Sequence, residues 1–360
     1  MSDLNPIPDL LAGLHEGLVS TAEGTVATYI PQLSYADPSW FGIALATLDG
    51  HVYSAGDADR LFTIQSVSKP FVYALALADR GLDRMIRSVG VEPSGDAFTA
   101  IRLEPRTGRP RNPMVNAGAI ITTSLVDGAK PAERLERIRA GLSLFAGREL
   151  DIDDSVVESE LDTGDRNRAI AYLMRSAGSL DADVDDTLRV YFQQCAIRVN
   201  ASDVAVMAAT LANAGVNPLT GVTVVDPDVA AHVLTVMATC GMYDFAGEWL
   251  MRVGLPAKSG VSGGITAALP GQFGIGLFSP PLDARGNSVR GIAACEELSA
   301  RFGLHLMRSP DLSAPAPTEV VTGRTVRSTA ERTMAERDAL GRDGGAIAIR
   351  GIVGDIGFAT

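Results

Sequence analysis

Ser66 and Lys69 lie three residues apart in the stretch QSVSKP (65–70), and this pair of residue types could perform nucleophilic acyl transfer. If a helix begins near Ser66, the two side chains share one face of its first turn. Pro70 is tolerated there because the first helical N–H groups have no intrahelical partner. The positive end of the helix and partial burial would both lower the pKa of Lys69, so that its amine could accept the Ser66 proton.

Lysine is rare in this chain, and the positions of the few lysines strengthen the interpretation of Ser66 and Lys69 as a catalytic pair. Of 31 Lys and Arg residues only Lys69, Lys130 and Lys258 are lysines. An arginine cannot act as a base, so a chain that otherwise prefers arginine would still need lysine for that task. Lys258 opens the stretch KSGVSGGI (258–265), and K-[ST]-G on a strand is the partner that serine acyl-transfer enzymes place opposite S-x-x-K. The competing interpretation is that Lys69 and Lys258 are ordinary surface residues.

Composition narrows the class of protein. A chain of 360 residues can bury a large core, and its net charge of -12 argues against nucleic acid and anionic membranes as partners. The three cysteines lie far apart in apolar stretches, which is typical of free thiols in a reducing compartment. The four histidines have no metal-ligand spacing, so no metal is expected. The opening MSDLNPIPDLL has no basic segment and no apolar run reaches membrane-spanning length, so we expect a cytoplasmic protein.

The apolar pattern predicts two lobes of a mixed α/β catalytic domain. Residues 9–34 show a helical stripe, and two apolar runs around Asp49-Gly50 predict a β-hairpin. Strand patterns return at 257–268, 273–278 and 290–294, before a closing helix over 293–306. We therefore expect an antiparallel-rich sheet lobe from about 35–64 and 255–307, an inserted all-helical lobe over about 70–250, and the active site between them.

The region beyond residue 307 is different in composition. Residues 308–318 form a linker rich in Pro, Ser and Ala, and 319–360 form a C-terminal tail. Within the tail, 327–341 predicts a charged helix and 346–358 a β-strand. The tail is too short for a core of its own.

Several longer motifs give the chain a resemblance to a known family. It resembles the bacterial-type serine-dependent glutaminases, relatives of the β-lactamase and penicillin-binding proteins, across about residues 5–307. The matching stretches, in chain order, are YIPQL (29–33), QSVSKP (65–70), NPMVNAGAI (112–120), SE (159–160), RNRA (166–169), YFQQC (191–195), CGMYDFAGEW (240–249) and KSGVSGGI (258–265). The tail sequence GDIGF (354–358) is similar to the opening of a STAS-type domain, which some relatives carry.

The resemblance implies a β-lactamase/transpeptidase-like fold and hydrolysis of L-glutamine to L-glutamate and ammonia through a glutamyl-serine ester, with no cofactor. Ser66 would be the nucleophile and Lys69 the base, and the backbone N–H groups of Ser66 and Val261 would form the oxyanion hole. Tyr191 and Tyr243 would line the site, with Tyr243 relaying a proton to the leaving ammonia. Lys258, Ser259 and Gly260 would support the site.

The resemblance also implies partners for the two charged ends of a free amino acid. Glu160 would pair with the α-ammonium group, and the remaining substrate-binding positions would be Tyr29, Gln65, Asn116 and Asn167. Taken singly, Glu160 could belong to an acidic surface stretch, Asn116 to a turn and Asn167 to a helix N-cap. Their joint occurrence in the motif order favours the binding interpretation.

Two alternatives remain open at this point. A penicillin-interactive acylase or β-lactamase would share Ser66, Lys69 and Lys258, although its targets lie outside the cytoplasm. A regulatory binding module with an inactive catalytic domain is the other, and intact Ser66, Lys69 and KSG argue against it. A homodimer or homotetramer is expected from the resemblance.

Overall fold

The computed structural model describes residues 6–95, 102–308, 319–322, 324, 333–346 and 348–351. The chain divides into two compact units, Met1–Leu306 and Met307–Thr360. The first unit contains every residue that the sequence assigns to the site.

The centre of the first unit is a five-stranded antiparallel sheet with strand order β2-β1-β7-β6-β5. Its strands are β1 (Gly42–Thr47), β2 (Val52–Gly56), β5 (Ala257–Ser259), β6 (Gly264–Leu269) and β7 (Phe273–Phe278). The predicted hairpin is confirmed, because β1 and β2 pair from Gly42 opposite Gly56 to Ala46 opposite Val52. Gly50 has φ 88° in the turn between them, a conformation that glycine adopts without a Cβ clash.

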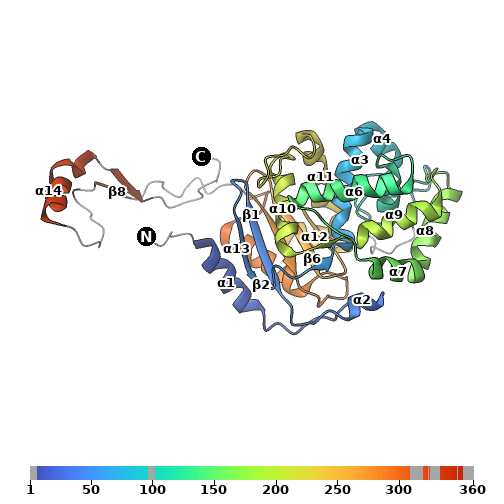
Figure 1. The fold of residues 1–360 in the computed structure, drawn as a ribbon, viewed down its shortest axis with the longest axis horizontal. Helices are drawn as coiled ribbons and strands as arrows, with labels where there is room; N and C mark the ends of the chain where they lie inside the picture. The colour runs from blue at the N-terminus through green and yellow to red at the C-terminus, as the bar shows by residue number, and fades with distance from the viewer. Residues whose placement is uncertain are drawn as a thin grey trace. The chain divides into compact units, whose positions relative to one another are not determined.

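The two faces of the sheet pack against different helices (Figure 1). One face, with Ile43, Ile265 and Ile275, shares an apolar core with α1 (Pro6–Leu18), α12 (Ala246–Arg252) and α13 (Val289–Phe302). The other face, with Ala44 and Ala268, packs on α10 (Ala201–Ala212) and on the helices beyond it. Successive side chains along each strand point to opposite faces of the sheet, so one sheet contributes to two apolar cores, one on each face.

Helix α10 approaches the sheet closely because β7 carries glycines where the two meet. A Cβ added at Gly276 would lie 2.0 Å from the carbonyl oxygen of Ala201, and one added at Gly274 would lie 2.2 Å from that of Ala205. Helix α10 falls inside the segment expected to form an all-helical lobe, yet it covers the sheet. Most other helices of the first unit gather on the α10 side of the sheet (Figure 1). They are α3 (Lys69–Arg80), α4 (Leu82–Ser88), α5 (Asn116–Leu125), α6 (Pro131–Ala146), α7 (Asp154–Thr163), α8 (Asp165–Ser176), α9 (Val184–Cys195) and α11 (Pro227–Cys240).

Two predicted elements are wrong. The helix expected over 9–34 is broken, because α1 ends at Leu18 and the chain runs extended to the short α2 (Pro31–Ser34). Within that stretch Thr25 exchanges backbone hydrogen bonds with Leu282 at 2.9 Å, so the segment pairs with a distant loop instead of coiling. The strand expected over 290–294 is helical, because the Ser288 side chain accepts from Gly291 N and starts α13 early.

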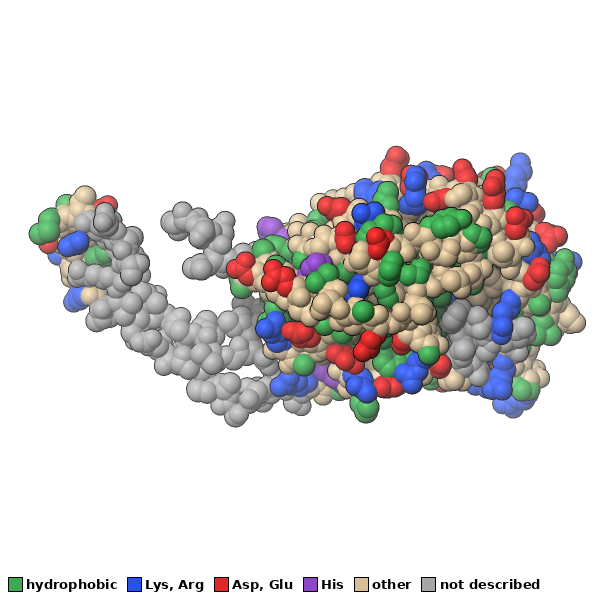
Figure 2. All heavy atoms as spheres, turned by 90° about the horizontal axis from the view of Figure 1, so that it is seen from below, with side chains coloured by type: hydrophobic (Ala, Val, Ile, Leu, Met, Phe, Trp, Pro, Cys, Tyr) green, Lys and Arg blue, Asp and Glu red, His purple; other side chains and the backbone are tan. Residues whose placement is uncertain are grey.

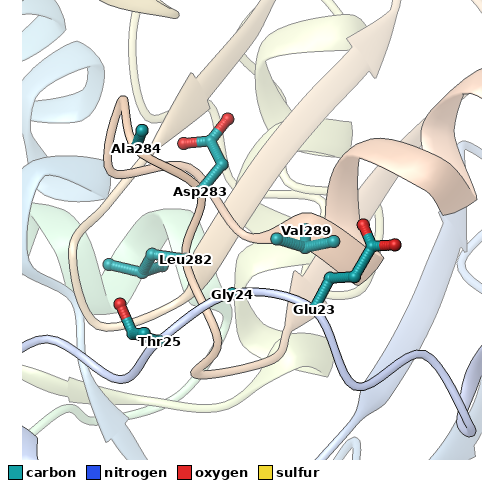
Figure 3. Close-up of a pocket in the computed structure, with 7 residues that line it drawn as sticks. All are labelled: Glu23, Gly24, Thr25, Leu282, Asp283, Ala284 and Val289. Atoms are coloured by element: carbon teal, nitrogen blue, oxygen red, sulfur yellow. The ribbon is translucent and has the colours of Figure 1, made fainter.

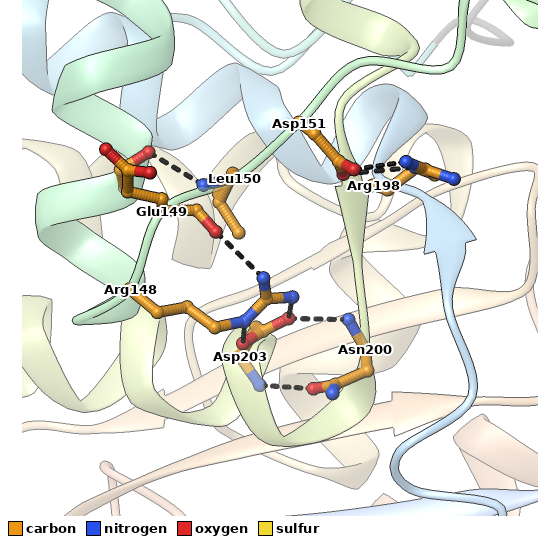
Figure 4. A network of polar contacts seen from close by, with 8 residues as sticks. Arg148, Glu149, Leu150, Asp151, Arg198, Asn200 and Asp203 are labelled. Atoms are coloured by element: carbon orange, nitrogen blue, oxygen red, sulfur yellow. Dashed lines mark hydrogen bonds and ion pairs between the residues drawn. The ribbon is translucent and has the colours of Figure 1, made fainter.

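An ion-pair network fixes the start of α10 (Figure 4). Asn200 and Asp203 form a capping box, in which Asp203 N donates to Asn200 Oδ1 at 2.8 Å and Asn200 N donates to Asp203 Oδ2 at 2.8 Å. Arg148, from the loop after α6, binds both carboxylate oxygens of Asp203, at 2.6 and 2.5 Å. Nearby, Arg198 pairs with Asp151 in the same bidentate way. These contacts tie the loop between α6 and α7 to the helix that lies on the sheet.

The second unit is described in part. It contains β8 (Glu319–Thr322) paired antiparallel with β9 (Ala348–Gly351), and α14 (Met334–Asp343) with a capping box formed by Thr333 and Glu336. The predicted tail helix is thus found over its second half, and residues 327–332 lie outside the described residues. The predicted strand is found over 348–351. The linker residues 309–318 and the GDIGF sequence also lie outside the described residues.

Charges are mixed on the face of the molecule that Figure 2 shows, where Asp and Glu side chains alternate with Lys and Arg. Most of the ion pairs formed by described residues are partly exposed, such as Arg80 with Asp127 and Arg301 with Glu297. Exposed pairs of this kind contribute about 0 to 1 kcal/mol each, so the cores on either side of the sheet carry the stability.

The close approach of α10 to β7 generates a prediction. Gly276→Ala places a Cβ against backbone atoms that cannot rotate away, so we expect a loss of about 1 to 3 kcal/mol in the free energy of unfolding. Gly13→Ala in α1 is the control, since no atom lies within 4 Å of the added Cβ, and it should be neutral or stabilise by about 0.5 to 1 kcal/mol. Denaturant unfolding of both variants checks this. A Gly276→Ala protein as stable as the parent would contradict the packing described here.

Candidate active site

Ser66 lies in a single 3₁₀ turn, Gln65–Ser68, that leads directly into α3 at Lys69. The preceding β3 (Phe62–Thr63) pairs with β4 (Arg198–Val199), which anchors the start of the turn. Pro70 stands in the first turn of α3, as its missing N–H allows. Ser66 is 8% exposed and Lys69 is 1% exposed, whereas Lys130 is exposed. The surface interpretation therefore applies to Lys130 and is wrong for the other two lysines, since Lys258 is 0% exposed.

Burial favours the neutral amine of Lys69, the form that could act as a base. It lowers the pKa of Lys69 to about 8, against smaller opposing effects from Cys195 and Glu160. The Lys69 amine donates to Asn116 Oδ1 at 2.7 Å. As a free amine, Lys69 can make this hydrogen bond and still offer its lone pair to the proton of a neighbouring hydroxyl.

Tyr243 lies close to both buried lysines. The Lys258 amine lies 3.7 Å from the centre of the Tyr243 ring and the Lys69 amine lies 5.7 Å from it. Burial raises the pKa of Tyr243, and a hydrogen bond with Ser66 opposes that rise. Burial and the nearby Lys69 amine both hold the pKa of Lys258 well below its usual range. Tyr243 is thus a protonated phenol beside Ser66, and its hydroxyl donates to the Ser259 carbonyl oxygen at 3.4 Å.

Asn116, at the first position of α5, joins three of the predicted site residues. Its Oδ1 accepts from Lys69, and the Tyr191 hydroxyl donates to the same oxygen at 3.5 Å. Its Nδ2 donates to Asn167 Oδ1 at 3.0 Å. In this arrangement the Asn116 amide presents its oxygen to Lys69 and Tyr191 and its nitrogen to Asn167.

A second cluster joins Tyr29, Gln65 and Glu160. The Tyr29 hydroxyl lies 2.8 Å from Gln65 Oε1 and 2.5 Å from Glu160 Oε1, so two acceptors compete for one proton. Burial raises the pKa of Glu160, while Tyr29, Gln65 and Lys69 oppose the rise. Oxygen acceptors around a buried carboxylate are suited to an ammonium group.

The end of β5 lies against the nucleophile turn. A Cβ added at Gly260 would be 3.1 Å from a methyl group of Val67 and 3.3 Å from the carbonyl oxygen of Ile64, so glycine permits this approach. Val261 follows in the loop to β6 and is 7% exposed. Within the described part of the chain, no protein acceptor takes the N–H of Ser66 or Val261. Two free N–H groups at this junction could hold an oxyanion.

The site thus brings together residues that are far apart in the sequence, and one further contributor was not singled out from the sequence. Asn112 is 1% exposed, accepts from Met114 N at 3.0 Å and Val115 N at 3.2 Å, and donates to the Glu92 carbonyl. It shapes the loop that delivers Asn116 to α5. The sequence signal that could have indicated this role is the dipeptide Asn112-Pro113, which is typical of a turn.

A shallow depression of about 430 Å³ lies elsewhere, between the extended segment after α1 and the loop before α13 (Figure 3). Its lining residues are Glu23, Gly24, Thr25, Leu282, Asp283, Ala284 and Val289. None of them belongs to the predicted site.

The described residues contain no group of three or more His, Cys, Asp and Glu side chains that could hold a metal ion. No single helix in the described ranges is long and apolar enough to cross a membrane, and one sharply bent pair, Pro227–Cys240 with Tyr243–Arg252, meets the length and composition criteria together.

Comparison with known proteins places the chain in a family. The family model for glutaminases matches residues 24–307. A glutaminase of Trichormus variabilis is 54% identical over 302 residues, covering 84% of this chain and 90% of that protein. Glutaminase 2 of Bradyrhizobium diazoefficiens is 51% identical over 99% of this chain, which spans 57% of that longer protein.

Solved structures show the same relationship as the sequence comparison. The crystal structure of Mglu in its glutamate form has 50% sequence identity and a TM-score of 0.82, and the match covers 85% of this chain and 70% of that one. The predicted β-lactamase-like fold is confirmed by this likeness and by the mixed architecture of sheet and helices. By sequence and by structure, the chain belongs to the glutaminase family.

Proposed function

We propose that this chain hydrolyses L-glutamine to L-glutamate and ammonia, and that Ser66 carries the glutamyl group as an ester. The observation that carries this proposal is the buried Lys69 amine, which has a pKa lowered to about 8 and lies one helical turn from Ser66. Membership of the glutaminase family supports the substrate.

In the proposed first step, Lys69 takes the Ser66 proton and Ser66 Oγ attacks the side-chain amide carbon of glutamine. The N–H groups of Ser66 and Val261 stabilise the negative oxygen that forms. Collapse of the tetrahedral intermediate breaks the C–N bond, and the leaving nitrogen takes a proton from Tyr243, which is reprotonated through Lys69. Water then attacks the ester by the same route in reverse, releasing glutamate and restoring Ser66.

The raised pKa of Tyr243 and the lowered pKa of Lys69 support this division of roles. A phenol whose pKa is raised keeps its proton near neutral pH and can donate it to a strongly basic leaving nitrogen. An amine whose pKa is about 8 is partly neutral and can accept a proton. Lys69 is therefore assigned as the base and Tyr243 as the acid for the leaving group.

The free end of the substrate is assigned to the other cluster. We place the α-ammonium group against Glu160, Gln65 and the Tyr29 oxygen, and the α-carboxylate against the amides of Asn116 and Asn167 and the Tyr191 hydroxyl. The Tyr29 to Glu160 distance of 2.5 Å supports a compact acceptor cluster of the size that one ammonium requires.

The proposal includes a cytoplasmic location and a homodimer or homotetramer. Three buried free thiols, Cys195, Cys240 and Cys295, support a reducing compartment. Exposed Tyr172 and Leu173 on α8 offer apolar surface for a second copy. Cell fractionation and sedimentation equilibrium test the two parts, and a secreted or monomeric protein would contradict them.

The direct test of function is ammonia release from L-glutamine, with a penicillin as the competing substrate. The parent protein should release ammonia, leave the penicillin intact, and lose on the order of a thousandfold or more in kcat with Ser66→Ala. Penicillin hydrolysis without ammonia release would favour the acylase alternative. An active Ser66→Ala protein would remove Ser66 from the chemistry.

A pH prediction follows from Lys69. Because the free amine is the active form and its fraction grows as pH rises through the pKa, kcat/KM should rise to a plateau above about pH 8. Lys69→Arg should abolish turnover at every pH, since guanidinium stays charged. Lys130→Arg, at an exposed site, is the matched control and should keep the parent profile. A flat profile, or an active Lys69→Arg protein, would assign the base elsewhere.

Glu160 gives a prediction about specificity. Glu160→Gln removes the charge and nearly preserves the shape, so kcat/KM for L-glutamine should fall by about tenfold or more. The loss should shrink for the same molecule without its α-amine, which leaves no cation to pair. Glu158→Gln, at an exposed position of α7, should change neither value. Equal losses on both substrates would place Glu160 away from the ammonium.

A further inference from the structure

We propose that Ser68, Gln194 and Thr123 are positioning residues, forming a buried hydrogen-bond chain that holds Gln65, and with it the nucleophile Ser66, in the reactive conformation. This inference rests on the proposed function and extends it to three residues that touch neither the substrate nor the reacting atoms.

The conformation to be held is a strained one. Gln65 has φ 46°, in the left-handed region that side chains other than glycine rarely adopt. Such a residue costs roughly 1 to 3 kcal/mol and persists only where its surroundings fix it. Its side chain meets Tyr29 at 2.8 Å, and its carbonyl group precedes Ser66 directly. A change at Gln65 therefore reaches both the nucleophile and the binding cluster.

Ser68 supplies the contact that fixes the Gln65 backbone. Its hydroxyl donates to the Gln65 carbonyl oxygen at 2.7 Å. In a continuous α-helix that oxygen would accept from Lys69 N, but here Lys69 N donates to Ser66 O instead. The Ser68 hydroxyl thus adds a side-chain donor to the Gln65 oxygen, beside the i→i+3 backbone bonding of the 3₁₀ turn, and so favours a turn tighter than an α-helix at Ser66.

Gln194 and Thr123 complete the chain, and its direction is determined. Because a carbonyl can only accept, Ser68 spends its one proton on Gln65 and must accept from Gln194 Nε2, at 3.0 Å. The other side of that amide is then Oε1, which accepts from the Thr123 hydroxyl at 2.8 Å, and the same hydroxyl proton is shared with the Ala119 carbonyl oxygen at 2.9 Å within α5. Ser68, Gln194 and Thr123 are each 0% exposed, so water does not compete for these bonds.

The chain of bonds joins the helices that also carry substrate-facing groups. On α9, Gln194 lies three residues after Tyr191, and on α5, Thr123 lies seven residues after Asn116. These spacings put each pair on one face of its helix. A displacement of either helix would therefore move a binding group and loosen the nucleophile turn together.

Three substitutions test the chain. Ser68→Ala removes the donor to Gln65, Gln194→Met removes the donor to Ser68 at similar volume, and Thr123→Val removes the hydroxyl at similar volume. We expect kcat to fall by about tenfold or more for Ser68→Ala and by less for the other two, with smaller changes in KM, because Ser66 is displaced more than the substrate cluster. Thr123→Ser, which keeps the hydroxyl, should restore kcat.

Thr122→Val is the matched control. Thr122 is the neighbouring buried hydroxyl on α5, 1% exposed, and it donates to the Gly118 carbonyl within its own helix. Its melting temperature should fall about as much as that of Thr123→Val, while kcat stays within about twofold of the parent. A purely structural role for Thr123 would instead give the two valine variants the same kcat.

The double variant Ser68→Ala, Gln194→Met decides whether the residues act in series. Without the Ser68 hydroxyl, Gln194 Nε2 no longer has an acceptor through which it could position Gln65. The double variant should therefore have the kcat of Ser68→Ala alone. Independent, multiplying losses, or a Ser68→Ala protein with parental kcat, would overturn the inference while ammonia release by the parent protein still stands. A parent protein that releases no ammonia from L-glutamine would overturn both.

Discussion

The active site depends on an amine that is kept out of water. Lys69 is 1% exposed, and its nearest hydrogen-bond partner is the neutral amide of Asn116, so the cost of desolvating an ammonium outweighs the attraction of Glu160 and lowers the pKa to about 8. Gly260 packs closely against the turn that carries Ser66, and Asn112 holds the loop that leads to Asn116. Replacing the amide by a carboxylate would restore the charge of Lys69 and remove its capacity as a base.

The second buried lysine adds to this constraint. Lys258 lies over the face of Tyr243, and its nearness to Lys69 disfavours two positive charges at once. At most one of the two lysines is therefore readily charged at a time, as the proposed proton transfer through Lys69 requires. The sheet supplies Lys258 and the helices supply Lys69 and Asn116, so the candidate site lies where sheet and helices meet.

Much of this arrangement could be read from the sequence where the signal was local. Asp49-Gly50 predicted the hairpin, and Ser66 with Pro70 predicted a helix start. Non-local partners were not visible: Arg290 falls in a strand-like run, yet it donates to the Thr21 and Pro38 carbonyls from inside α13. Likewise, Gln194 belongs to a recognisable motif, but its partners Thr123 and Ser68 lie 71 and 126 residues away. Only the fold brings them together.

The central claim is that every substrate passes through the same glutamyl ester on Ser66. The most direct measurement adds hydroxylamine during turnover and determines the ratio of glutamyl hydroxamate to glutamate, first from L-glutamine and then from a γ-ester of L-glutamate. A common ester intermediate predicts the same ratio from both substrates at each hydroxylamine concentration, because the leaving group has departed before the ratio is set. Ratios that differ between the amide and the ester would show that water attacks the substrate directly, and would contradict the account.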